Sequence, residues 1–270
     1  MGAVSLRAEG YSPSEEPPVP HPNSIRWFSA LAAFVLLAFT GCARWCPAGA
    51  ERPQPAFREE ARPDKGWWHV RFKIDWPPET EDPAWHMDVL LAHKVISPVL
   101  ERHRQEICCW RFHRRAARDA GGHQFSFIFF CGRKTAAAVC EAVRSDALVQ
   151  EMKGAGWITQ DIYSDLTTVS QPRLEDTGDR RWSLPLQRSW PFFIMGVSDM
   201  WLALISEIIR SDRPAQEFTS LEETRDYYRA INERVEETWR KECGHALLHH
   251  LNALFGYGPL LVPGGASVQF

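Results

Sequence analysis

The 270-residue sequence lacks the short motifs that mark the common catalytic sites. It contains no serine nucleophile elbow, no Walker phosphate-binding loop and no dinucleotide-binding glycine fingerprint. The glycine pairs at 121–122 and 264–265 lack the residues that surround such loops. These absences favour a binding or assembly role and leave an enzyme as the alternative. We predict no cofactor.

The sequence also lacks an excess of positive charge. Its formal net charge is −3 and its pI is about 6.4, whereas a general nucleic-acid-binding protein is usually basic. We therefore expect no nucleic-acid partner. Nearby acidic residues dilute the one arginine-rich run, so we interpret it mainly as solvated surface, with an anionic lipid, phosphate or acidic partner as the alternative. The run comprises Arg102, Arg104, Arg111, Arg114, Arg115 and Arg118. Arg114 is the exception, because strand alternation places it on the same face as Trp110 and Phe112.

No two cysteines have the CxxC spacing of a zinc site or a redox pair. Besides Cys42 there are six, an even number that permits disulfides in an exported protein. They are Cys46, Cys108, Cys109, Cys131, Cys140 and Cys243. Strand pairing favours a bridge from Cys108 or Cys109 to Cys131. His245 and His249 are four residues apart, but no third ligand accompanies them, so we predict no metal site.

An apolar run of thirteen residues, 27–39, is too short for a membrane-spanning helix, which needs about 20 residues. Arg26 precedes it and small residues follow, as in a secretory signal. The next residues, Leu37–Cys42, read LAFTGC and resemble the lipobox of bacterial lipoproteins. Phe39 departs from that pattern, which usually has an aliphatic residue there. The resemblance implies a signal peptide over 1–41 and lipidation of Cys42. A short N-terminal anchor helix is the alternative.

The residues after Cys42 indicate where the protein is attached. Ala43 follows the cysteine in place of aspartate, and in the lipoprotein family this favours the periplasmic face of the outer membrane. Two or more acyl chains, palmitate among them, make such attachment stable. Residues 42–66 are rich in proline, alanine, arginine and glutamate without apolar periodicity. That composition cannot bury a core and predicts a flexible tether.

Residues 67–170 predict an α+β domain. Residues 69–76 alternate between apolar and polar side chains, which is typical of a half-buried strand. Further strands are expected over 108–114, 123–130 and 157–166, and helices over 85–100 and 134–152, with Pro98 kinking or breaking the first helix. The order β-α-β-β-α-β is the ferredoxin-like arrangement, with two helices on one face of the sheet. The other face is a candidate binding surface unless a partner or the C-terminal part covers it.

Residues 171–270 predict a linker and a helical region packed on that domain. The segment 171–189 is polar and irregular, and an apolar stripe follows over 200–209. Ser220 and Glu223 form a capping box that opens a long helix. Gly244 is a candidate interruption of this helix, and Gly256 is expected to end it.

One pairing of motifs resembles a known enzyme-associated domain. Trp110 to Arg114 reads W-x-x-x-R, and Gly122-His123 opens the next expected strand. This resembles the C-terminal domain of lantibiotic dehydratases and thiopeptide-type biosynthesis proteins, where that strand is followed by G-x-H-x-R-x-R. The element order is similar across about residues 67–210, and Ser198-Asp199 before a helix fits loosely. The resemblance implies Trp110, Arg114 and His123 as ligand-binding residues.

The sequence departs from that pattern at the two family arginines. Phe125 and Phe127 stand in their places, so the charge that would face an anionic glutamyl group is missing. That family also works in the cytoplasm, unlike an exported chain. Our leading hypothesis is therefore a lipid-anchored envelope protein with a non-enzymatic binding or assembly role and a protein partner. The alternatives are an enzyme or degenerate enzyme of the dehydratase-related group acting on a peptide, and a subunit of a membrane complex docked through the stripe 200–209. The oligomeric state is not specified.

Overall fold

The computed structural model describes residues 64–212, 218–256, 260–261 and 267–268. The chain divides into two compact units, Met1–Arg58 and Glu59–Phe270, and the described residues all belong to the second. The expected signal peptide, the lipidation site Cys42, Cys46 and nearly all of the tether lie outside the described residues. These expectations stay predictions.

Four antiparallel strands form the sheet of the domain. They are β1 (Lys65–Ile74), β2 (Cys109–Ala117), β3 (Gly122–Gly132) and β4 (Ile158–Tyr163), and their order across the sheet is β2-β3-β1-β4. Strand β1 pairs with β3 on one side and with β4 on the other. The prediction of a mixed fold of helices and an antiparallel sheet is confirmed.

Strand β1 is longer at its start than the sequence pattern predicts. Its alternation buries Val70, Phe72 and Ile74 on one face, as expected. The strand nevertheless begins four residues before His69, because Lys65 to Trp68 pair with the end of β3. It stops at Ile74, before the two prolines at 77–78, which have no N–H to donate to a neighbouring strand.

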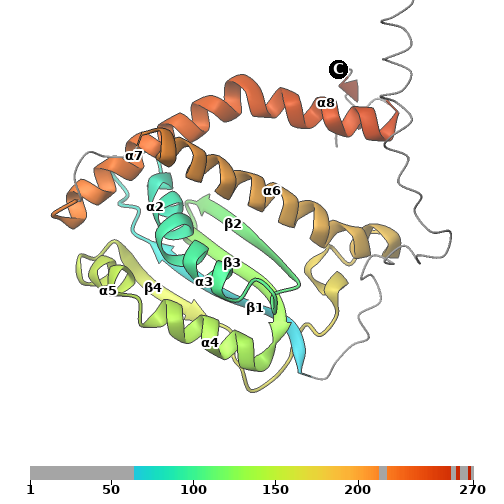
Figure 1. Cartoon of the computed structure of the whole chain (residues 1–270), viewed down its shortest axis with the longest axis horizontal. Coiled ribbons are helices and arrows are strands. Elements are labelled where there is room, and N and C mark those ends of the chain that lie inside the picture. The colour runs from blue at the N-terminus through green and yellow to red at the C-terminus, as the bar shows by residue number, and fades with distance from the viewer. Residues whose placement is uncertain (1–63, 213–217, 257–259, 262–266, 269–270) are drawn as a thin grey trace, which may run out of the picture. The chain divides into compact units, whose positions relative to one another are not determined.

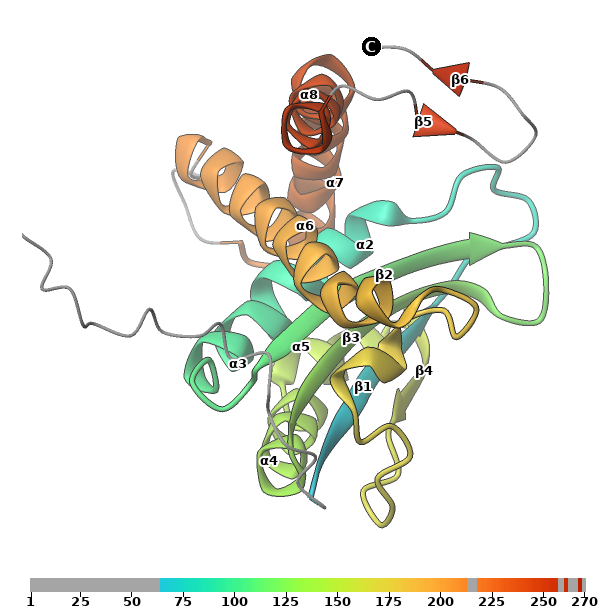
Figure 2. The same ribbon diagram turned by 90° about the vertical axis from the view of Figure 1, so that its right-hand side faces the viewer.

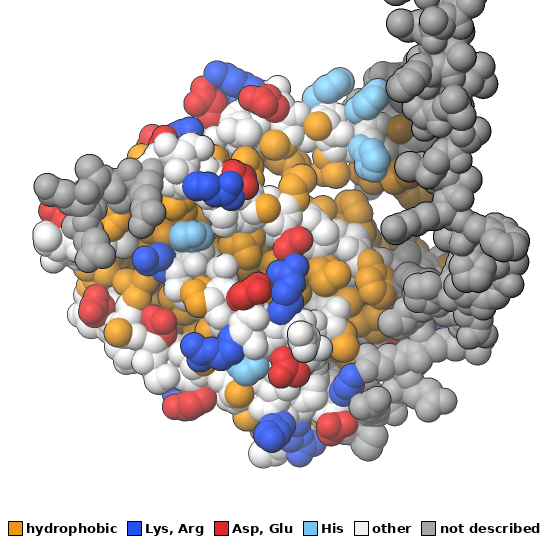
Figure 3. All heavy atoms as spheres, in the orientation of Figure 1, with side chains coloured by type: hydrophobic (Ala, Val, Ile, Leu, Met, Phe, Trp, Pro, Cys, Tyr) orange, Lys and Arg blue, Asp and Glu red, His pale blue; other side chains and the backbone are white. Residues whose placement is uncertain are grey.

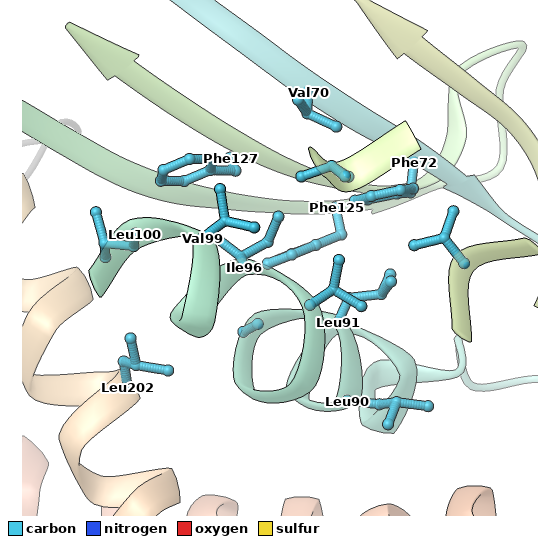
Figure 4. Packing of buried hydrophobic residues seen from close by; sticks show 14 of the residues in the cluster. Val70, Phe72, Leu90, Leu91, Ile96, Val99, Leu100, Phe125, Phe127 and Leu202 are labelled. Carbon is cyan, nitrogen blue, oxygen red and sulfur yellow. The ribbon is translucent and has the colours of Figure 1, made fainter. Parts of the chain in front are cut away.

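Helices cover one face of the sheet in two groups (Figure 1). The first group is a continuous helix made of α2 (Trp85–Leu90), the π-helical segment η1 (Leu91–Ile96) and α3 (Ser97–Arg102). The second group is α4 (Arg133–Arg144) and α5 (Ala147–Gly154). Side chains from the sheet and the first helix meet in the core (Figure 4). Burial of one such large apolar side chain contributes about 1.5–3 kcal/mol.

The first helix is not broken at Pro98, and the second expected helix is divided in two. Pro98 does not break the first helix, because the wider π-helical turns lie just before it, where its ring would otherwise clash with the carbonyl four residues back. The helix expected over 134–152 is two helices. Asp146 begins the second one, because its side chain accepts a hydrogen bond from the backbone N–H of Val149 at 3.2 Å.

The C-terminal region is helical, as predicted; its first helix begins earlier than expected, whereas the capping box of Ser220 and Glu223 opens a helix as predicted. It contains the short 3-10 turn η2 (Leu174–Thr177), α6 (Leu184–Ser211), α7 (Leu221–Thr238), the π-helical segment η3 (Trp239–Cys243), α8 (Gly244–Phe255) and the strands β5 (Leu260–Leu261) and β6 (Ser267–Val268). The segment expected to be irregular up to 189 is wrong from Leu184 onward, where Pro185 supports the first turn of α6.

Gly244 does not interrupt the last long helix, because the π-helical turns of η3 carry the chain into α8. Gly256 ends it, as expected, with a left-handed φ of +82°.

Helix α6 lies along the outer edge of β2 (Figure 2). The hydroxyl of Ser198, in the middle of α6, accepts a hydrogen bond from the backbone N–H of Phe112 at 3.1 Å. This contact satisfies a donor on an edge strand that would otherwise be unpaired. Within the described part of the chain, α6 alone is long and apolar enough to cross a membrane. Leu202, Ile205 and Ile208 of this helix are buried in the core of the domain.

The second face of the sheet is covered at one end only. There Leu174, Phe192 and Met195 pack over a small cluster formed by Trp67, Cys109 and Phe130. The other end of this face, toward Lys73 and Gln124, carries polar side chains. The open face expected from the sequence is thus shortened by the chain's own C-terminal region.

The expected disulfide is not formed. Cys109 pairs with Phe130 across the strands, so its side chain lies on the opposite sheet face from Cys131. A bridge between these two is geometrically excluded. Cys131 is a thiol in the structure, hydrogen-bonded to the carbonyl of Gly132, so no bridge from Cys108 forms either. Burial raises the pKa of Cys109 and of Cys131 to about 12, which keeps both as unreactive thiols.

Candidate functional site

A buried polar cluster lies around Asp88, a carboxylate on α2 that is fully buried. Its Oδ2 accepts a hydrogen bond from Arg114 Nε of β2 at 2.8 Å. Its Oδ1 lies 3.0 Å from His123 Nε2 of β3, without the alignment of a hydrogen bond. A charge at such depth requires a partner of opposite charge, and Arg114 supplies it.

The guanidinium of Arg114 is held between two tryptophans. Its central carbon is 4.8 Å from the ring centroid of Trp85 on α2 and 5.0 Å from that of Trp201 on α6. It also donates from Nη2 to the carbonyl of Trp85 at 3.1 Å. The side chain is 26% exposed, so part of the guanidinium reaches the surface while Asp88 stays buried beneath it. Cation–π contacts of this kind favour the charged group where water is partly excluded.

His123 is fully buried and has no direct access to solvent. Its ring meets the Trp85 ring edge to face, with centroids 4.9 Å apart. Its other ring nitrogen, Nδ1, has no hydrogen-bond partner among the described residues. The His123 ring is thus shielded from solvent and lies against Asp88 and Trp85.

The structure therefore brings together two of the three residues that the sequence singles out. Trp110 lies two strand repeats away from Arg114 on the same face, and its ring packs against Phe112 and Phe127 in the core. It is a core residue that makes no contact with Asp88. Ser198-Asp199 lies inside α6 and not before a helix, because α6 begins at Leu184.

Sequence reasoning missed Asp88, Trp85 and Trp201. Asp88 interrupts an otherwise apolar stretch of helix, between Met87 and Val89, which are both buried. A carboxylate in such a stretch signals a buried partner. Arg114, expected on the apolar face of its strand, was the matching signal, but the sequence alone does not show that these elements face each other.

Beside this cluster lies a groove of about 700 Å³, which we call the α6–η3 groove. Arg114, Phe112 and Ser198 line it on one side, and α7 and η3 form the other wall. Its apolar lining comprises Phe112, Val197, Met200, Trp201, Leu204, Val235 and Trp239. Hydrophobic side chains are visible over α6 and beneath α8 (Figure 3). A mainly apolar pocket of this size with a few polar groups is typical of a ligand site.

The charged side chains at the groove are mostly basic. Arg114, Arg240 and His113 line it, together with the carboxylate of Glu236. Glu236 already accepts a hydrogen bond from the Asn232 amide at 2.9 Å. Partial burial, followed by the neighbouring arginines, lowers the pKa of His113, so it is mainly neutral near pH 7. Arg114 is already paired with Asp88, so the positive charge offered to the apolar groove comes mainly from Arg240, which lies near Glu236 and forms no ion pair among the described residues.

No group of three or more metal-binding side chains occurs within the described ranges. The rings of His245 and His249 lie 6.0 Å apart and stack on one face of α8. That the protein holds no metal and no cofactor stays a prediction.

Comparison of the chain with known protein families, curated proteins and solved structures gives no match. The dehydratase-like and lipoprotein-like motifs therefore remain resemblances.

Proposed function

We propose that this chain is a lipid-anchored protein of the bacterial envelope whose folded domain binds an apolar molecule carrying an acidic group. The α6–η3 groove is the observation that carries the proposal. Its walls are aromatic and aliphatic, and its rim holds the guanidinium groups of Arg114 and Arg240. An acyl chain removes apolar surface from water there, while a carboxylate or phosphate meets the arginines.

Membrane attachment rests on the sequence around Cys42 and on the expected tether that follows it. Placement at the periplasmic face of the outer membrane rests on Ala43. A protein partner in the envelope stays a prediction. The domain's ferredoxin-like topology is likewise a proposal, supported by the element order β-α-β-β-α-β and by the sheet order β2-β3-β1-β4.

Isothermal titration tests the groove with two ligands of equal chain length and opposite charge. We expect the full-length protein to bind dodecanoate below its micelle concentration, and to bind dodecyltrimethylammonium at least tenfold more weakly. Arg240→Gln should weaken dodecanoate binding about tenfold, the usual effect of losing one charge-assisted hydrogen bond. Met200→Asp should abolish it.

Arg210→Gln is the matched control, because Arg210 is exposed near the end of α6 and pairs with Glu207 outside the groove. Equal binding of the two ligands, or no effect of the groove variants, would contradict the proposal. The enzyme alternative predicts chemical change of a peptide substrate, lost in Arg114→Met.

A further inference from the structure

On the sheet face that the helices leave open, side chains of β1, β3 and β2 lie side by side in three rows. The first row is His69–Ile128–Arg111, the second is Arg71–Ser126–His113 and the third is Lys73–Gln124–Arg115. On β1 and β2, on either side of β3, all six side chains of these rows are basic: His69, Arg71 and Lys73 on β1, and Arg111, His113 and Arg115 on β2. Strand β3 contributes only the neutral Gln124, Ser126 and Ile128 between them. The rows therefore place two lines of basic groups roughly 10 Å apart, twice the spacing of neighbouring strands.

The third row has partners of its own. Arg115 forms an ion pair with Asp119 and donates to the carbonyl of Gly122 at 3.2 Å. Lys73 donates to the carbonyl of Ala120 at 3.2 Å. These two side chains are held by the β2–β3 turn.

The arginines of the first two rows are different. Among the described residues, Arg71 donates only to the neutral hydroxyl of Ser126, at 3.3 Å. Arg111 buries its Nε without a hydrogen-bond partner among the described residues. Neither arginine forms an ion pair with a carboxylate in the part of the chain that the structure describes. A partly buried guanidinium without such a partner favours the approach of an anion.

These two arginines line a cavity of about 600 Å³. Its wall is the chain from Ser164 to Gly178, which leaves β4 and runs beside β1. Ser164 fixes the start of this wall, because its hydroxyl accepts from the backbone N–H of His69 at 2.7 Å. Gln171 fixes the next part, because its carbonyl accepts from the backbone N–H of Trp67 at 2.9 Å. The wall offers the hydroxyls of Thr168, Ser170 and Thr177, whereas that of Ser164 is engaged by His69.

Two carboxylates of the wall line the cavity, Asp165 and Asp176, and both are engaged elsewhere. Asp165 accepts from the backbone N–H and the hydroxyl of Thr167, both at 2.8 Å. Asp176 accepts from the backbone N–H of Arg173 at 2.9 Å and from its guanidinium at 3.3 Å. They therefore reduce the positive potential of the cavity without pairing with Arg71 or Arg111.

The pKa values of the two neighbouring histidines, His69 and His113, are lowered by burial and, to a smaller extent, by the arginines. Burial, and then Arg71, lowers the pKa of His69. Partial burial, and then Arg111, Arg71 and Arg115, lowers the pKa of His113. Both imidazoles are mainly neutral at pH 7, so the positive charge of the cavity comes from the arginines.

We propose that this cavity binds the phosphate group of a small polar molecule through the guanidinium groups of Arg71 and Arg111 and the hydroxyls of the wall. A planar guanidinium matches the paired oxygens of a phosphate, and hydroxyl groups satisfy the remaining ones. The volume accommodates more than a bare ion. The site shares no lining residue with the α6–η3 groove, so it is independent of the function proposed above.

Titration calorimetry of the full-length protein tests this site with inorganic phosphate, a hexose phosphate and vesicles of phosphatidylglycerol. Arg71→Gln and Arg111→Gln should each weaken binding at least tenfold, and Arg71→Lys should restore part of it. Arg115→Gln is the matched control, because Arg115 lies on the same face but pairs with Asp119. Melting curves of each variant separate lost binding from lost folding.

Binding of the hexose phosphate, lost in both variants, identifies a soluble ligand. Binding of the vesicles alone, lost in the same variants, identifies a lipid headgroup as the source of the phosphate. No binding of any of the three probes, or equal binding by wild type and both folded variants, would overturn the proposal.

Discussion

Asp88 and Arg114 join helix α2 to strand β2 through a hydrogen-bonded ion pair of 2.8 Å. The carboxylate is fully buried, whereas the arginine is 26% exposed. The pair therefore links the core of the domain to the rim of the α6–η3 groove. Its partners Trp85 and Trp201 extend the link to helix α6.

Removal of one partner of this pair should be costly. We expect Asp88→Asn and Arg114→Met each to lower the free energy of unfolding by about 3 kcal/mol, because each leaves the other group without its charge partner. The double variant should cost less than the sum of the two. Urea unfolding of the four proteins measures the coupling, and additive effects would show that the two groups do not interact.

The Ser198 hydroxyl should stabilise the edge of the sheet. Ser198→Ala removes the acceptor for the Phe112 N–H, and we expect a loss of about 1 kcal/mol in the free energy of unfolding. Ser206→Ala is the matched control, since that hydroxyl bonds only within α6, to the carbonyl of Leu202. Equal losses in the two variants would mean that the contact with β2 adds no stability.

Gly66 should be required for the close packing of residues 169–171 against β1, beside the cavity that Arg71 and Arg111 line. A Cβ at this position would lie 2.5 Å from Val169 and 3.0 Å from the carbonyl oxygen of Gln171. We expect Gly66→Ala to destabilise the domain by about 1–3 kcal/mol through overpacking. Gly154→Ala, where a Cβ meets nothing within 4 Å, should be neutral or slightly stabilising. Thermal melting compares the two variants, and equal melting temperatures would contradict the prediction.

Acid should destabilise the domain through His86. Burial, followed by Arg229 and Arg225, lowers the pKa of His86 from 6.5 to about 4. In the unfolded chain His86 binds a proton near pH 6.5, whereas in the folded chain it does so only near pH 4. Its contribution is therefore complete above pH 6.5 and lost as the pH falls toward 4, on the order of 2 kcal/mol after allowance for partial exposure.

Urea unfolding at pH 7 and at pH 4.5 measures this effect. His86→Gln should show a smaller loss of stability between the two pH values than the wild type. An unchanged pH dependence in the variant would assign the acid sensitivity to other groups.

The sequence predicts most of the sheet, because alternating side chains mark β1 and the aromatic end of β3 marks a strand buried on both faces. It also places Arg114 on the apolar face of β2. The partner of Arg114 could not be predicted, because the approach of α2 to β2 depends on packing between separate elements. Alternation likewise shows that His69 and Arg71 share a face, but not that the chain after β4 returns to wall it.

The beginning of α6 could not be predicted from polarity alone. The polar residues up to Ser189 predict an irregular segment, yet the helix already begins at Leu184. Its first half is stabilised by contacts such as that of Phe192 with the second sheet face. Tertiary packing thus decides the local structure of this segment.

Membrane attachment through Cys42 is the central claim of this account. Mass spectrometry of the mature N-terminus, on protein purified from bacterial membranes, tests it most directly. The account predicts an N-terminal peptide that begins at Cys42 and carries the mass of its acyl chains, and that is absent in Cys42→Ala. An unmodified N-terminus upstream of Cys42, with the apolar run 27–39 retained, would contradict it.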